Sequence, residues 1–160
     1  MKTYVLTLSQ VFPATHPRKG EPTNFKVSLL NALFIHDPIA PIKLHTIRGN
    51  YELWRKRFEE IDAGKACLSI REWSGKPYQS KQVEIARLTK EDGIGLQKLT
   101  LKPSLNCCGT VQSNTGLPRG VPEATLAKYD GLSYEDWKAW FKNYDFSKPF
   151  AIIHFSKDIY

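Results

Sequence analysis

The sequence predicts an α+β fold, in which a small mixed β-sheet or barrel is flanked by about three helices. About six short segments have the alternation or the β-branched and aromatic composition of strands, and three segments combine capping residues with helical periodicity. These segments do not alternate regularly as strand and helix, which argues against a parallel α/β sheet. The chain has 160 residues, enough to bury a core, and we expect one domain over residues 1–160.

The first third of the chain is expected to form a strand, a loop and a short helix. Residues 3–12 alternate as a strand, and residues 13–22 are rich in turn formers and charge, as in a loop. Asn24 can cap a helix that runs to Phe34, with three leucines and Phe34 on its buried side. Prolines then force an irregular passage before a strand at residues 43–48, KLHTIR.

A second helix is expected directly after this strand. Asn50 can cap it, and Trp54, Phe58 and Ile61 recur at the spacing of one helical face. Gly64 is placed to end the helix.

A hairpin and a further strand follow. Residues 66–73 alternate as a half-buried strand, and the turn SGKPYQS leads to a partner strand at residues 81–88. Residues 96–101 form another short strand. Residues 102–122 are rich in Gly, Pro, Asn and Ser and are predicted to be a long surface loop, a kind of segment that often serves function.

The last helix has the clearest signal. Ser133 begins the capping box SYED, and four aromatic residues share one apolar face: Trp137, Trp140, Phe141 and Tyr144. The apolar stretch FAIIHF after Pro149 predicts a final strand.

Charge points toward polyanionic partners. The chain has 23 Lys and Arg against 16 Asp and Glu, a net charge of +7, and basic domains of this size favour nucleic acids. Between Lys43 and Arg87 the basic residues interleave with aromatic residues, as suits phosphate contact and base stacking. A solvated basic face with its aromatic rings turned into the core explains the same composition equally well. No apolar run is long enough to span a membrane and no signal peptide is recognisable, so we expect a cytoplasmic protein without a membrane partner.

The cysteines and histidines suggest no metal and no cofactor. Cys67, Cys107 and Cys108 are odd in number and lack a C-x-x-C spacing, and the pair at 107–108 has no assigned role. The four histidines are scattered along the chain. We therefore expect neither a disulfide framework nor a metal site.

The order of several segments resembles the ASCH domain, a branch of the PUA-like superfamily. These segments are KLHTIR, a helical segment ending in AGK, a strand, and the turn WSGKPY with its partner strand. The closing LSYEDWKAWF and FAIIHF segments match the family's last helix and strand, so the resemblance covers nearly the whole chain. It implies a PUA-like fold and a module that binds RNA or a modified nucleoside or nucleotide in a basic cleft.

Some small members of this family are amidohydrolases that remove the acetyl group from N4-acetylcytidine, with a Lys, a Thr and a carboxylate implicated. By the resemblance, the Lys matches Lys43, the Thr matches Thr46, the motif's Arg matches Arg48, and Asp130 is nearest the carboxylate. Asp130 is shorter than the family's Glu. Two further departures stand out: Pro41 replaces the Gly two residues before the lysine, and the long loop at 102–122 could cover or reshape a cleft.

Hydrolysis by these residues depends on geometry. In a straight strand Lys43 and Thr46 point to opposite faces, so the chemistry requires a bulge or turn near Leu44–His45. Thr46 would be the nucleophile and Lys43 its base if burial lowers the pKa of the amine. Asp130 could accept or relay the proton, or orient the amine. A solvated strand-end lysine, an ordinary strand threonine and a turn aspartate are the plainer interpretation. Arg48 would hold a phosphate or polarise a carbonyl.

Three further residues are candidates for contacting a ligand. His45 lies inside the motif and can stack on a base or titrate near neutral pH, although a strand histidine with a satisfied partner is the commoner case. Lys76 and Tyr78 project from the WSGKPY turn. A third function, protein interaction, requires an exposed Trp137 or Trp140, and we expect both to be mostly buried.

Overall fold

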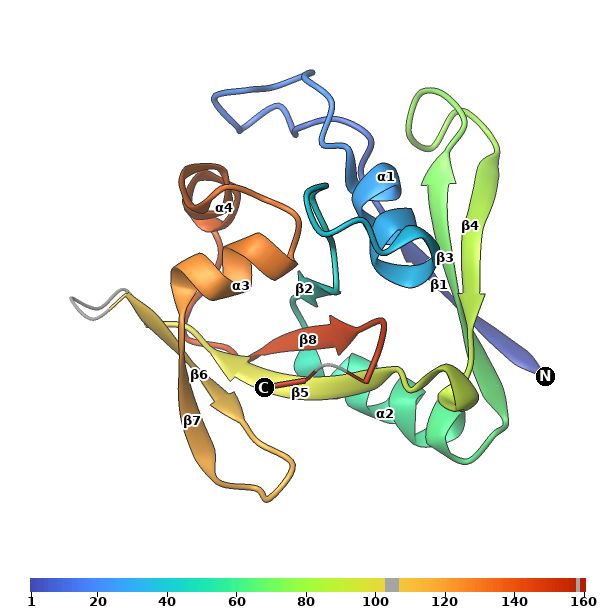
Figure 1. The fold of residues 1–160 in the computed structure, drawn as a ribbon, viewed down its shortest axis with the longest axis vertical. Helices are drawn as coiled ribbons and strands as arrows, with labels where there is room; N and C mark the ends of the chain where they lie inside the picture. The colour runs from blue at the N-terminus through green and yellow to red at the C-terminus, as the bar shows by residue number, and fades with distance from the viewer. Residues whose placement is uncertain (103–106, 158) are drawn as a thin grey trace.

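The computed structural model describes residues 1–102, 107–157 and 159–160. In these residues the chain has an α+β fold, as predicted, with four α-helices and eight strands in two sheets. Both sheets are open, so the described strands form sheets rather than a closed barrel (Figure 1). None of the described helices is long and apolar enough to cross a bilayer.

The first sheet has three strands in the order β1-β3-β4 and stands at the right of Figure 1. β1 (Lys2–Thr7) pairs in parallel with β3 (Ala66–Trp73), which pairs antiparallel with β4 (Gln82–Leu88). The predicted hairpin is therefore confirmed. The first strand is shorter than predicted, because it ends at Thr7 and the chain then enters a loop.

The second sheet has five strands in the order β2-β8-β5-β6-β7, and all neighbours in it are antiparallel. Its members are listed here in that order: β2 (His45–Arg48), β8 (Phe150–His154), β5 (Gly95–Thr100), β6 (Cys108–Gln112) and β7 (Pro118–Pro122). All five residues of β8 are buried, consistent with its continuous apolar sequence and its place between two strands. The strand order places β2 at one edge of the sheet.

The prediction of a long surface loop at 102–122 is wrong. β6 and β7 form a hairpin in this stretch, while residues 103–106 lie outside the described part of the chain. Gly109 and Val111 face the core, and a Cβ on Gly109 would lie 2.8 Å from Leu99 and 3.0 Å from Leu126. The glycine that suggested a loop is a strand residue with no room for a side chain.

Three of the four helices were expected. α1 (Phe25–Leu30) continues into a π-helical turn, and its predicted cap is wrong, because the side chain of Asn24 accepts no capping hydrogen bond. Leu29 is buried on this helix, but Phe34 in the following turn is 65% exposed. α2 (Tyr51–Asp62) is capped as predicted, because the side chain of Asn50 accepts the Leu53 N–H.

The helix at the end of the chain is also confirmed. α4 (Tyr134–Phe141) begins at Ser133, whose hydroxyl accepts the backbone N–H of Asp136 at 3.2 Å. α3 (Glu123–Tyr129) was not predicted. Its signals were the preceding proline and the following Gly131, which adopts φ +84.

The buried side chains form two clusters. One joins the first sheet to α1, α2 and one face of β8, through Ala151 and Ile153, and the other joins the opposite face of β8 and the rest of the second sheet to α3 and α4. Leu132 and Trp140 pack against both clusters. Trp137 is 3% exposed and Trp140 is partly buried, so the predicted burial of Trp137 is confirmed.

The hairpin assignment predicts that two glycines differ in their tolerance of a side chain. Gly109→Ala is expected to lower the free energy of unfolding by about 1–3 kcal/mol, because its Cβ would crowd Leu99 and Leu126. Gly120→Ala, on the partner strand, has no atom within 4 Å of its Cβ and is expected to change stability little. Urea unfolding of the two variants measures the difference, and equal stabilities would contradict the inward position of Gly109.

Candidate functional site

A cleft of about 640 Å³ opens where the end of the first sheet meets β2 and α4. This volume lies in the range of small-molecule sites, about 300–1,000 Å³. β2 and the chain before it contribute Lys43, Thr46 and Arg48, and Asp130 comes from the end of α3. The other polar and aromatic residues that line it are Thr7, Ser9, Phe12, Phe25, Trp73, Tyr78, Gln82, Trp140, Phe141 and Tyr144.

The chain geometry at β2 brings the motif residues together. Thr46 and Arg48 are two residues apart in a strand and therefore share a face. Lys43 reaches the same cleft because the strand begins only at His45, and the two preceding residues take an irregular path. This path is held by the Lys43 N–H, which donates to Ser28 O at 3.1 Å, and by the Leu44 N–H, which donates to Tyr129 O at 2.8 Å. The departure from a straight strand that hydrolysis requires is thus present.

Lys43 and Asp130 form a buried ion pair. The Lys43 side chain is 1% exposed and that of Asp130 is 5% exposed. Lys43 Nζ donates to Asp130 Oδ1 at 2.7 Å and to the Asp130 backbone carbonyl at 2.5 Å, and it lies 4.1 Å from the centre of the Phe25 ring. Burial lowers the pKa of Lys43, and the nearby carboxylate opposes that effect by favouring the ammonium.

Gly131 allows this pair to form. It follows Asp130 with a left-handed backbone, and a Cβ at this position would lie 3.3 Å from the Cβ of Lys43. A residue with a side chain would therefore be strained by the left-handed backbone angle, and its Cβ would also crowd the side chain of Lys43. The end of α3 is shaped to receive Lys43.

Thr46 has a free hydroxyl in the cleft. The residue is 5% exposed, and within the described part of the chain its Oγ1 makes no hydrogen bond. A hydroxyl without a partner can act as a nucleophile once a base takes its proton, and Lys43 lines the same cleft. The hydroxyl can equally donate to, or accept from, a bound ligand.

Arg48 is partly buried and has few partners. Its Nη2 donates to the Thr7 carbonyl at 2.7 Å, whereas its buried Nε has no partner among the described residues. Burial lowers the pKa of Arg48, with Asp130 acting in the opposite direction. A guanidinium in this setting is a strong potential donor to an oxyanion.

Aromatic side chains form the mouth of the cleft. Tyr78 is 89% exposed and adopts φ 63, an uncommon backbone angle for a residue with a side chain. Its ring lies 5.1 Å from that of Trp73, centre to centre. Such exposed rings suit stacking with another planar group.

Two predicted ligand contacts lie elsewhere. Lys76 is exposed in the β3–β4 turn and is not among the residues that line the cleft. His45 points away from it, because neighbouring strand residues face opposite sides. His45 instead lines a separate cavity of about 220 Å³, where its Nε2 lies 2.8 Å from the Tyr160 hydroxyl. Burial places the pKa of His45 well below its usual value.

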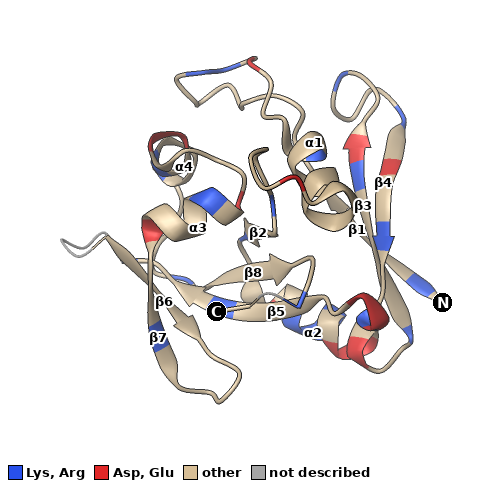
Figure 2. Cartoon of the chain, in the orientation of Figure 1, with Lys and Arg blue, Asp and Glu red and all other residues tan. Residues whose placement is uncertain are grey.

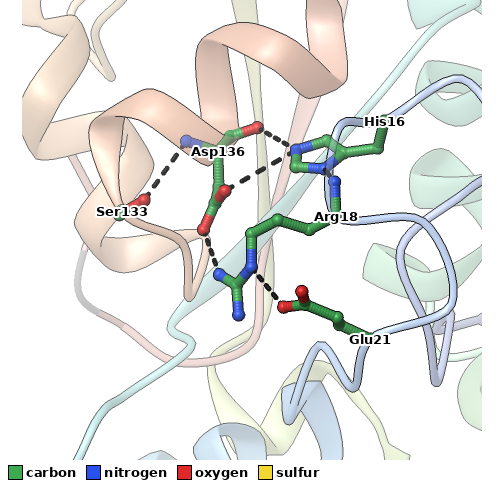
Figure 3. A network of polar contacts seen from close by, with 5 residues as sticks. All are labelled: His16, Arg18, Glu21, Ser133 and Asp136. Atoms are coloured by element: carbon green, nitrogen blue, oxygen red, sulfur yellow. Dashed lines mark hydrogen bonds and ion pairs between the residues drawn. The ribbon is translucent and has the colours of Figure 1, made fainter.

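A loop between β1 and α1, residues 8–24, covers part of the cleft and is tied to α4 (Figure 3). His16 Nδ1 accepts the Arg18 backbone N–H at 3.0 Å, so its Nε2 carries the proton and donates to the Asp136 carbonyl, also at 3.0 Å. Arg18 Nη1 donates to Asp136 Oδ2 at 2.6 Å, and its Nε donates to Glu21 Oε2 at 2.6 Å. Phe12 in the cleft wall packs against these residues, with its ring 4.4 Å from that of His16 and 4.8 Å from the Arg18 guanidinium.

Sequence patterns did not identify the walls of the cleft. Phe12, Gln82 and Trp140 come from three distant segments, and no local motif links these segments. Trp140 had been assigned to the core from its helical spacing, and it serves both roles. These contributions follow from the tertiary arrangement.

The basic residues are not concentrated at the cleft. Figure 2 shows Lys and Arg spread over both sheets and the helices. Of the described residues that line the cleft, only Lys43, Arg48 and Asp130 carry charge. Within the described chain, no group of three or more His, Cys, Asp or Glu lies close enough to hold a metal ion.

Comparison of the chain with family models, with curated proteins and with solved structures found no match in any of the three.

The buried ion pair is expected to be sensitive to removal of either partner. Lys43→Met should lower the free energy of unfolding by about 3–5 kcal/mol, because it leaves the Asp130 carboxylate buried without its cation. Asp130→Asn should also destabilise the protein, and the double variant should cost less than the sum of the two. Urea unfolding of all three gives the coupling energy.

Lys2→Met is the matched control, because the Lys2–Glu60 pair is exposed and should matter little. Strict additivity of Lys43→Met and Asp130→Asn would argue against a direct interaction.

Proposed function

We propose that the chain is an ASCH-type, PUA-like module whose cleft binds RNA or a modified nucleoside or nucleotide. The observation that carries this proposal is the common placement of Lys43, Thr46, Arg48 and Asp130 in one cleft. These are the positions that the family resemblance singles out, and they come from two segments separated by more than eighty residues. The order of sequence segments that resembles the family supports the same conclusion.

The walls of the cleft also suit a nucleobase. Trp73 and Tyr78 offer aromatic faces, and stacking on such rings contributes about 1–3 kcal/mol per base. Gln82 donates from Nε2 to Thr7 Oγ1 at 3.1 Å, which leaves its amide oxygen for a ligand. The dispersed basic charge favours a ligand held inside the cleft over a long strand laid across the surface.

The binding proposal predicts a specific loss on mutation. Arg48→Ala and Trp73→Leu should each weaken nucleoside or nucleotide binding at least tenfold, because one removes a buried donor and the other a stacking face. Lys76→Ala, outside the cleft lining, should bind as the parent does. Titration calorimetry with nucleosides, their 5′-monophosphates and short oligonucleotides measures these affinities. Absence of binding to every member of the set would refute the proposal.

A second candidate is hydrolysis of N4-acylated cytidine, favoured by the free hydroxyl of Thr46, which lines the same cleft as the buried Lys43. Thr46 Oγ1 would attack the acyl carbon while its proton passes to the neutral amine of Lys43. That proton would then go to the departing N4 as the C–N bond breaks. Water would hydrolyse the resulting ester, releasing the carboxylic acid and restoring Thr46. Burial of Lys43 favours the neutral amine that this route needs.

Hydrolysis is tested by incubating the protein with N4-acetylcytidine and following the release of cytidine. Thr46→Val should abolish turnover, whereas Thr46→Ser should retain part of it because it keeps the hydroxyl. Lys76→Ala serves as the control. Binding without turnover would leave the binding module as the function, and turnover that survives Thr46→Val would refute the assigned nucleophile.

A protein-interaction role has less support. Its candidate surface was the last helix, and Trp137 on that helix is 3% exposed.

A further inference from the structure

We infer that the cleft selects an anionic ligand, and that Arg48 binds the phosphate of a nucleotide in preference to the neutral nucleoside. This inference rests on the proposed function and narrows it. It follows from the balance of charge inside the cleft, from the free donors of Arg48 and from their position on β2.

Charge in the cleft is unbalanced without a ligand. The ammonium of Lys43 faces the carboxylate of Asp130 at 2.7 Å. This pair has no net charge whether the proton between them lies on the amine or on the carboxylate. Arg48 is then the remaining charged residue among the described residues that line the cleft, and none of the described carboxylates forms an ion pair with it.

Arg18 differs from Arg48 in the partners of its guanidinium group. Arg18 is about half exposed, yet it is held by two carboxylates, those of Asp136 and Glu21 (Figure 3). Arg48 is less exposed, with its Nε buried, and is bonded to one backbone carbonyl, that of Thr7. A buried cation gains far more than an exposed one from an anionic partner, because water screens it less.

Arg48 retains the donors that such a partner needs. Only Nη2 forms a hydrogen bond within the described chain, so Nη1 and Nε have none. Nη1 is not enclosed by protein, since of the guanidinium nitrogens only Nε is both buried and unpaired. Guanidinium groups bind phosphate through paired N–H donors and remain charged at all physiological pH values.

The position of Arg48 fits one ligand that spans the cleft. Arg48 follows Thr46 by two residues on the same face of β2, which separates their Cα atoms by about 7 Å along the strand. A phosphate at Arg48 therefore leaves the rest of the nucleotide to extend toward Thr46 and the Lys43–Asp130 pair. The aromatic walls lie around that space.

The test compares neutral and charged forms of the same compounds. Titration calorimetry is run with the four common ribonucleosides and N4-acetylcytidine, each beside its 5′-monophosphate. For a compound that binds, the monophosphate should bind at least tenfold more tightly than the nucleoside, and the ratio should shrink as salt is raised. Arg48→Gln should bring the ratio close to one, Arg48→Lys should keep part of it, and Lys76→Gln should leave it unchanged.

Three outcomes would decide against the inference. Equal binding of nucleoside and monophosphate by the parent protein would overturn it and leave the proposed function intact. A preference for the monophosphate that persists in Arg48→Gln would overturn the assignment to Arg48. Absence of binding by any compound would overturn the proposed function as well. Thermal unfolding of Arg48→Gln and Arg48→Lys checks that loss of the Thr7 contact has not unfolded the protein, and the Arg48→Lys result then decides.

Discussion

The buried ion pair between Lys43 and Asp130 is the contact on which the architecture of the cleft depends. It joins the irregular segment before β2 to the end of α3, two parts of the chain that no strand pairing connects. Charges are costly to bury, and this pair is accommodated because the ammonium also donates to a backbone carbonyl and lies over the Phe25 ring. Gly131 supplies the close approach that the lysine stem requires.

The position of β2 follows from the same contact. As an edge strand it pairs only with β8 among the described strands, so its start is set by the segment that Lys43 anchors. Alternation along β2 directs Thr46 and Arg48 to the cleft and His45 to the opposite side. The irregular path of the two residues before His45 brings Lys43 to the same cleft.

Much of the fold could be predicted from local signals, and the site only in part. The caps at Asn50 and Ser133 and the strand and helix periodicities identified most elements correctly. The hairpin at β6 and β7 was missed because Gly109 resembles a loop residue until its neighbours Leu99 and Leu126 are known. The family resemblance selected the residues that converge in the cleft, whereas its walls depend on contacts between distant segments that no local pattern encodes.

Trp140 links the two buried clusters, so the stability of each depends on the other. Its indole packs against both clusters and also lines the cleft. Loss of order in either cluster removes contacts from the other, so the two clusters should unfold as one cooperative unit. A ligand binds in the cleft only when both clusters are folded. Binding would therefore raise the melting temperature of the entire chain.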